Sequence, residues 1–127
     1  MNLQPLIFIL DDDEKNLKLC RDILQAVGYR TAEARVAEEG IRLIEACAPS
    51  LVLMDIRLPG MDGYAAMMRL RNDLRTRDIP IVALTASVML EEQEQMIQAG
   101  FKAFKAKPVK VQELLTLVRS ILEQRAQ

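Results

Sequence analysis

Histidine is absent from this 127-residue sequence. Its absence excludes catalysis by Ser-His or Cys-His pairs and every metal site that needs an imidazole ligand. The two cysteines, Cys20 and Cys47, lack the CxxC spacing of a metal or redox motif, so the sequence favours the reduced thiols of a cytoplasmic protein over a disulfide. The chemistry of this chain must therefore use carboxylates, hydroxyl groups and lysine.

Long apolar runs and an excess of charge of one sign are lacking as well. The apolar run over residues 6–10 is too short to span a membrane, and no basic segment of a signal peptide precedes it. The chain has 17 basic and 18 acidic residues, and the basic ones are scattered along it. This balance argues against membrane insertion and direct nucleic-acid binding, and the composition predicts one globular domain over residues 1–127.

Short apolar segments alternate with helical periodicities along the chain. The pattern predicts strands over residues 6–10, 29–34, 51–54, 79–84 and 102–106. It predicts helices over residues 16–27, 37–48, 64–70, 91–99 and 111–122. A series of strand–helix units predicts an α/β fold, a doubly wound, five-stranded parallel sheet in a flavodoxin-like three-layer sandwich.

The polarity of the strands predicts their order in the sheet. The first, third and fourth strands are apolar throughout and suit the centre, whereas the second and fifth include charged residues such as Glu33 and Lys105 and suit the edges. The order 2-1-3-4-5 satisfies both conditions. In such a sheet the ligand site lies beyond the carboxyl ends of the strands, between the first and the third.

Polar residues stand at those carboxyl ends. The first strand is followed by Asp11, Asp12 and Asp13, the third by Asp55, the fourth by Thr85 and the fifth by Lys107. An acidic loop repels phosphate, unlike the glycine-rich loops that bind nucleotides. Carboxylates around a small, hard cation suit Mg²⁺, and magnesium together with a lysine can hold a phosphoryl group against an aspartate.

The segments FILDDDEKN, LVLMDIRLPGMDG, IVALTA and FKAKP resemble the receiver domain of two-component response regulators, in particular single-domain, chemotaxis-regulator-like members. The resemblance covers nearly the whole chain. It implies that Asp55 accepts a phosphoryl group from a phosphohistidine on a sensor histidine kinase or a histidine phosphotransfer protein. It also implies that Asp12, Asp55 and the backbone carbonyl of Arg57 bind Mg²⁺, with Asp11 acting through water.

The resemblance further implies how the phosphoryl group is bound and sensed. Thr85, Lys107 and the backbone at Arg57 and Ala86 are expected to contact it. Thr85 and Phe104, which occupies the position of the family's Tyr or Phe switch residue, are expected to signal its presence. The output is expected on the face formed by the fourth helix, fifth strand and fifth helix, where a downstream protein would bind.

The same resemblance limits what the sequence can decide. Arg57 and Ser87 flank the expected phosphoryl position and tune its lifetime in this family, so the lifetime cannot be read from the motif. The chain is expected to catalyse only its own phosphorylation and dephosphorylation. A free-standing regulator and a receiver excised from a larger protein both remain open.

Three alternatives are weaker. A haloacid-dehalogenase-like phosphatase also uses an aspartate nucleophile. It requires Thr or Val where this chain has Lys15, and an acidic pair in its last motif, for which this chain has only the distant Glu113. A phosphorylation-independent receiver-like binding module predicts a replaced acceptor or lysine, and both are present. A calcium loop starting at Asp11 lacks the glycine at its sixth position, which is Asn16. Asp13 is interpreted as a helix N-cap.

Overall fold

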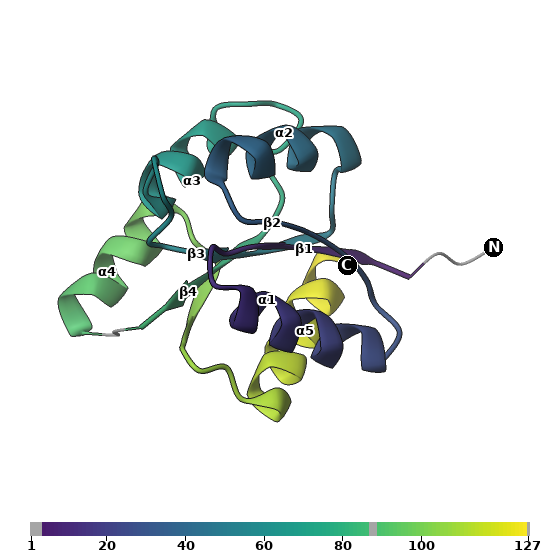
Figure 1. Cartoon of the computed structure of the whole chain (residues 1–127). Coiled ribbons are helices and arrows are strands. Elements are labelled where there is room, and N and C mark those ends of the chain that lie inside the picture. Colours follow the sequence, from purple (N-terminus) through teal and green to yellow (C-terminus); the bar gives the residue numbers. More distant parts are fainter. Residues whose placement is uncertain (1–3, 87–88, 127) are drawn as a thin grey trace.

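The computed structural model describes residues 4–86 and 89–126, in which strands and helices alternate (Figure 1). The strands are β1 (Leu6–Leu10), β2 (Arg30–Ala34), β3 (Leu51–Asp55), β4 (Ile81–Thr85) and β5 (Ala103–Ala106). The helices are α1 (Glu14–Ala26), α2 (Ala37–Cys47), α3 (Gly63–Arg71), α4 (Leu90–Ala99) and α5 (Val111–Ala126). Across these described ranges, none of the helices combines the length and the apolar character that crossing a membrane requires.

The strands form one parallel sheet in the order β2-β1-β3-β4-β5, which confirms the predicted order and both edge assignments. The central strands β3 and β4 are buried along their whole length, whereas β5 is only half-buried. The register places Asp55 opposite Leu84 and Thr85 opposite Ala106. The carboxyl ends of β3, β4 and β5 therefore lie side by side at one end of the sheet.

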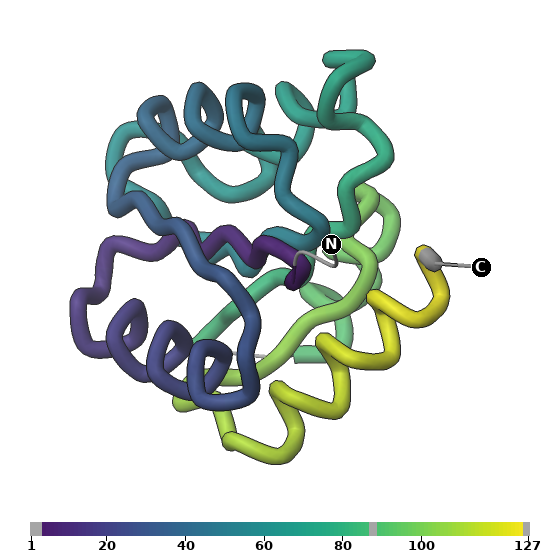
Figure 2. The backbone as a smooth tube through the Cα atoms, turned by 90° about the vertical axis from the view of Figure 1, so that its right-hand side faces the viewer, coloured from purple at the N-terminus to yellow at the C-terminus, as the bar shows by residue number. Residues whose placement is uncertain are grey.

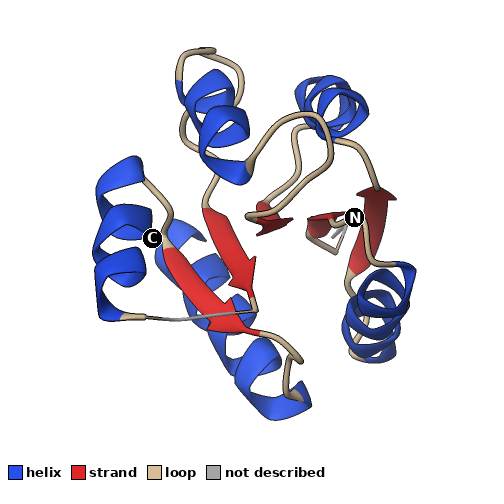
Figure 3. Ribbon diagram, turned by 60° about the vertical axis from the view of Figure 1, so that its left-hand side comes forward, coloured by secondary structure: helices blue, strands red, loops and turns tan. Residues whose placement is uncertain are grey.

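Helices cover both faces of the sheet, as Figures 1 and 2 show from two directions. Alternate side chains of β1 point to opposite faces: Ile7 and Ile9 pack with α1 and α5, and Phe8 and Leu10 pack with α2 and α3. Met96 of α4 belongs to the second of these two core clusters. The red strands in Figure 3 lie between the blue helices, so the predicted three-layer sandwich is confirmed.

Most element boundaries differ from the prediction by one residue or more. The starts of α1 and β4 are each displaced by two residues, for local reasons. α1 begins at Glu14, two residues early, because the Asp13 side chain accepts a hydrogen bond from the Lys15 N–H (3.0 Å) and so caps the helix as expected. β4 begins at Ile81 and not at Ile79. The Ile79 N–H donates to the Thr76 carbonyl (3.1 Å) and belongs to the preceding turn, and Pro80 has no N–H to donate.

Gly63, the first residue of α3, lies against the backbone that follows β3. A Cβ atom at this position would lie 2.7 Å from the Ile56 Cα and 3.0 Å from its carbonyl oxygen. The Gly63 N–H donates to that same carbonyl (2.6 Å). The start of α3 therefore fixes the main chain directly after Asp55, and only glycine permits this approach.

We expect Gly63→Ala to lower the free energy of unfolding by about 2 kcal/mol, because the clash is with main-chain atoms that cannot rotate away. Gly40→Ala is the matched control. Its Cβ would meet the end of the Leu10 side chain at 2.6 Å, which can adjust, and alanine regains up to about 1 kcal/mol of helix propensity. Urea unfolding measures both variants, and an equal or larger loss for Gly40→Ala would contradict this account.

Candidate functional site

The polar residues predicted at the strand ends come together at the carboxyl-terminal end of the sheet. Asp11 follows β1 and is fully buried, while Asp55 and Thr85, which end β3 and β4, are 6% and 9% exposed. Lys107 follows β5, and its N–H donates to the Thr85 carbonyl (2.8 Å). Four strands thus bring two carboxylates, a hydroxyl group and an ammonium group into one cluster.

The ammonium group of Lys107 bridges the two buried carboxylates. Its Nζ lies 2.9 Å from Asp11 Oδ2 and 3.0 Å from Asp55 Oδ2. Burial lowers the pKa of Lys107, but the hydrogen bonds and charges of Asp11 and Asp55 outweigh this effect and raise it above its usual value. The lysine therefore remains charged between the two acids.

The surroundings of Asp55 make the charge on its carboxylate unfavourable. Burial raises the pKa of its carboxyl group above the ordinary value, and the nearby charge of Asp11 adds to this effect. The Arg57 N–H, which donates to Asp55 Oδ1 (2.9 Å), and Lys107 act in the opposite direction without cancelling it. One ammonium group thus serves two buried carboxylates, and the cluster retains excess negative charge.

Asp11 is held by more partners than the sequence predicted. Its Oδ1 accepts from the Asp13 N–H (2.9 Å), and its Oδ2 accepts from the Asn16 side-chain amide (2.6 Å) as well as from Lys107. Asn16, which is 6% exposed, was not among the residues predicted from the sequence. The available signal was a polar residue four positions before Cys20, on the buried face of α1.

The acidic residues fit a small, hard cation. Carboxylate oxygens of Asp11, Asp12 and Asp55 all lie within 4.8 Å of one another. Two oxygens bound to one Mg²⁺ lie about 3–4 Å apart, so this spacing allows shared ligation after small side-chain movements. Asp12 is exposed, and its carboxylate accepts no hydrogen bond within residues 4–86 and 89–126, whereas both oxygens of Asp11 are engaged. The Asp12 carboxylate is therefore more accessible to a cation than that of Asp11.

The remaining predicted residues lie around this cluster. Ala86 follows Thr85 directly and is exposed, and Ser87 lies outside the described residues. Phe104 pairs with Ala83 in the sheet, and its half-buried ring packs against the core cluster that contains Met96 of α4. The predicted switch residues therefore occupy the two neighbouring strands β4 and β5.

Comparison with known proteins identifies this arrangement. Residues 7–119 match the family model of the response regulator receiver domain. This chain belongs to that family. The receiver match also sets aside the haloacid-dehalogenase-like alternative.

Individual relatives agree with the family match. The polar-differentiation response regulator DivK of Brucella ovis is 36% identical over 116 residues, covering 91% of this chain and 94% of the relative. The receiver domain of a Pseudomonas aeruginosa sensor histidine kinase is 31% identical with a TM-score of 0.87, covering 94% of this chain and 98% of that one, and its crystal structure has a magnesium ion in the active site cleft. A CheY-like receiver protein from Methanospirillum hungatei is 29% identical with a TM-score of 0.89, each chain being 97% covered.

The receiver family explains the acidic cluster. Receiver domains are the phosphoacceptor modules of two-component signalling and bind Mg²⁺ at an acidic site. In this receiver the cluster of Asp11, Asp12 and Asp55 is consistent with a magnesium ion and an acceptor aspartate. Receiver domains signal through protein partners such as histidine kinases, phosphotransfer proteins and downstream targets.

We expect Asp55→Asn to stabilise the metal-free receiver at neutral pH. The folded-state pKa of Asp55 lies above its ordinary value, so the ionised carboxylate destabilises the fold above that pKa. The advantage of the variant should shrink as the pH falls through the raised pKa toward the ordinary value of 3.8, because the wild-type carboxyl group then binds its proton.

Chemical unfolding in EDTA across this pH range measures the effect. Asp78→Asn, at a surface carboxylate that is 89% exposed, is the control and should change little. A variant less stable than wild type at neutral pH, or an advantage that grows on acidification, would show that Lys107 compensates Asp55 fully.

Proposed function

We propose that Asp55 accepts a phosphoryl group from a phosphohistidine on a sensor histidine kinase or a histidine phosphotransfer protein. An Asp55 oxygen bonds to phosphorus as the bond from phosphorus to the imidazole nitrogen breaks. The observation that carries this proposal is the placement of the Lys107 ammonium group 3.0 Å from Asp55 Oδ2, beside a carboxylate whose other oxygen accepts from the Arg57 N–H. A fixed carboxylate with an adjacent cation is what phosphoryl transfer needs, because positioning and charge neutralisation provide most of its catalysis.

The same geometry suggests a role for each neighbouring residue. Asp12, Asp55 and the Arg57 carbonyl would hold Mg²⁺, with Asp11 acting through water, and the bound ion would neutralise charge on the phosphoryl oxygens. Lys107 lies close enough to pair with the phosphoryl group on Asp55. Thr85 is the last residue of the neighbouring strand β4 and Ala86 follows it, so the Thr85 hydroxyl group and the Ala86 N–H would donate to the phosphoryl oxygens.

We assign the 127-residue chain to one receiver domain that catalyses only its own phosphorylation and dephosphorylation. The cytoplasm is the compartment that its two cysteines favour, since Cys20 and Cys47 are unpaired. Burial and the charge of Asp11 raise the pKa of the Cys20 thiol to about 12, which keeps it protonated and unreactive.

Acetyl phosphate with Mg²⁺ should place one acid-labile phosphoryl group on the wild-type protein and none on Asp55→Asn. Asp78→Asn, which replaces an exposed carboxylate, should label like wild type. Removing the metal with EDTA should abolish most of the labelling, because the charge on the incoming phosphoryl group is then uncompensated. Intact-mass spectrometry reads all four samples, and equal labelling of wild type and Asp55→Asn would exclude Asp55 as the acceptor.

We further propose that phosphorylation changes the face formed by α4, β5 and α5, where a downstream protein binds. Thr85 would donate a charge-assisted hydrogen bond to the phosphoryl group and move toward Asp55, which opens space for the Phe104 ring to turn inward. Such a bond is worth roughly 1.5–3 kcal/mol, enough to shift a two-state population about ten- to a hundredfold. Support comes from the half-burial of Phe104 beside β4, where the ring has a core to enter.

Thr85→Ala should still accept a phosphoryl group on Asp55, since its hydroxyl group is not the nucleophile, but α4, β5 and α5 should no longer respond. Amide NMR spectra with and without beryllofluoride test this for wild type, Thr85→Ala and Phe104→Ala. Thr31→Ala, in the edge strand β2, is the control and should respond like wild type. A full response of this face in Thr85→Ala would remove Thr85 from the signalling route.

A further inference from the structure

A concave site lies at the opposite end of the strands from the acidic cluster. It is a cavity of about 510 Å³ between α3, α4, α5 and the strands. Pro80, directly before β4, and Lys102, directly before β5, line it and place it at the amino ends of these strands. The length of a five-residue strand, about 16 Å, separates it from Asp55 and Thr85.

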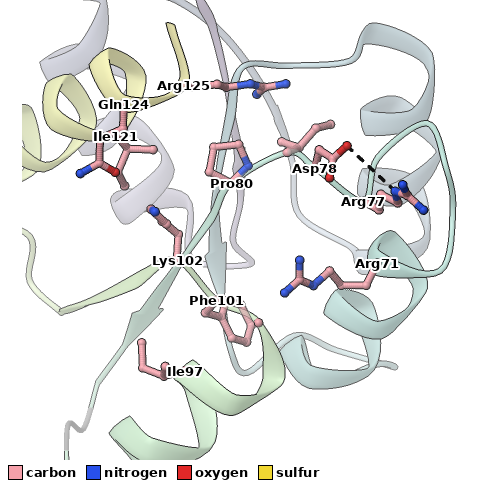
Figure 4. A pocket seen from close by; sticks show the side chains of 12 residues that line it. Arg71, Arg77, Asp78, Pro80, Ile97, Phe101, Lys102, Ile121, Gln124 and Arg125 are labelled. Atoms are coloured by element: carbon pink, nitrogen blue, oxygen red, sulfur yellow. Dashed lines mark ion pairs between the residues drawn. The ribbon is translucent and has the colours of Figure 1, made fainter. Parts of the chain in front are cut away.

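Basic side chains from four different parts of the fold line this cavity (Figure 4). Arg71 ends α3, Arg77 lies in the following loop, Lys102 precedes β5, and Arg125 lies near the end of α5. Among the described residues of the lining the only carboxylate is that of Asp78, so these residues carry a net charge of +3 although the whole chain has −1. The folded chain therefore concentrates positive charge where the sequence shows no basic run.

Most of these charges have no acidic partner. Elsewhere on the surface arginines pair with carboxylates, as Arg21 does with Glu33 at 2.9 Å. In the part of the chain that the structure describes, Arg71, Lys102 and Arg125 form no salt bridge, and Arg77 reaches Asp78 only at 4.0 Å. Unpaired cations around a concavity create a positive potential that attracts anions.

Two of the arginines lie against other parts of the fold. The Arg71 guanidinium group lies against Gly100, where a Cβ atom would be 2.6 Å from its Nε. Gly100 caps the C-terminus of α4 with a φ of 109°, and the partial negative charge of that helix end favours a cation there. Arg125 Nη1 donates to the Ser50 carbonyl (2.6 Å). Arg125 is therefore tied to the backbone just before β3, while Arg71 lies at the end of α4.

We propose that this cavity binds an organic phosphate with at least two negative charges and an apolar part of nucleoside size. Guanidinium groups pair with phosphate through parallel hydrogen bonds, and Lys102 adds a flexible point charge. The volume falls within the range of about 300–1,000 Å³ that is usual for small-molecule sites. Ile97 and Ile121 provide apolar lining beside the cations. These basic residues surround a single cavity and form no extended stripe, which favours a compact ligand over an extended acidic peptide.

The test is an amide NMR titration with ADP in EDTA, which keeps Mg²⁺ out of the acidic site. Wild type should show saturable shifts at Gly100, Phe101 and Lys102, with a Kd tighter than about 1 mM at about 0.15 M salt. Adenosine, which lacks phosphate, should produce none. Lys102→Gln and Arg71→Gln should each weaken ADP binding about tenfold through loss of one charge-assisted contact.

Matched controls decide whether the cavity is responsible. Arg119→Gln removes an exposed charge of α5 that does not line the cavity and should bind ADP like wild type. Asp55→Asn should also bind like wild type, so the result is independent of the phosphoacceptor assignment. The proposal is overturned if ADP produces no saturable shifts, if Arg119→Gln weakens binding as much as Lys102→Gln, or if a polyglutamate peptide binds where ADP does not.

Discussion

The acidic cluster of this receiver depends on the salt bridges from Lys107 to Asp11 and Asp55. Asp11 is fully buried and Asp55 is 6% exposed, so water cannot screen the repulsion between them. The ammonium group offsets one of these charges, and the hydrogen bond from the Lys107 N–H to the Thr85 carbonyl ties its backbone to the end of β4. Because one negative charge remains, a divalent cation would neutralise it. A phosphoryl group would be favoured there only together with such a cation.

The fold could be predicted because the apolar or charged composition of each strand indicates whether it is central or at an edge of the sheet. Residues 7–10 are apolar, and all four are fully buried in the centre of the sheet, while Arg30 and Lys105 mark strands at its edges. The boundaries were less accurate, since the start of β4 depends on a turn that pairs Ile79 with Thr76. That pairing is a local hydrogen bond, which hydrophobic periodicity does not report.

The site was predictable in position and not in its contacts. In a parallel sheet the carboxyl ends of all strands lie at the same end, so the placement of Asp11, Asp55 and Lys107 followed from the strand order. The role of Asn16 did not follow, because it depends on how the first turn of α1 faces Asp11. The basic cavity was hidden for the same reason, since Arg71, Lys102 and Arg125 are far apart in the sequence and meet only in the folded chain.

The least buried of the described strands, β5, runs from the basic cavity to the acidic cluster at the opposite end of the sheet. β1, β3 and β4 lie in the interior, whereas β5 is half-buried over Ala103, Phe104 and Lys105 and exposed at Ala106. Lys102 precedes this strand and lines the basic cavity, and Lys107 follows it and belongs to the acidic cluster. Phe104 lies between the two lysines along the strand. Elements that bury the least surface are displaced at the lowest free-energy cost. Displacing β5 is therefore expected to cost less free energy than displacing β1, β3 or β4, and it would move Phe104 against the core beneath α4.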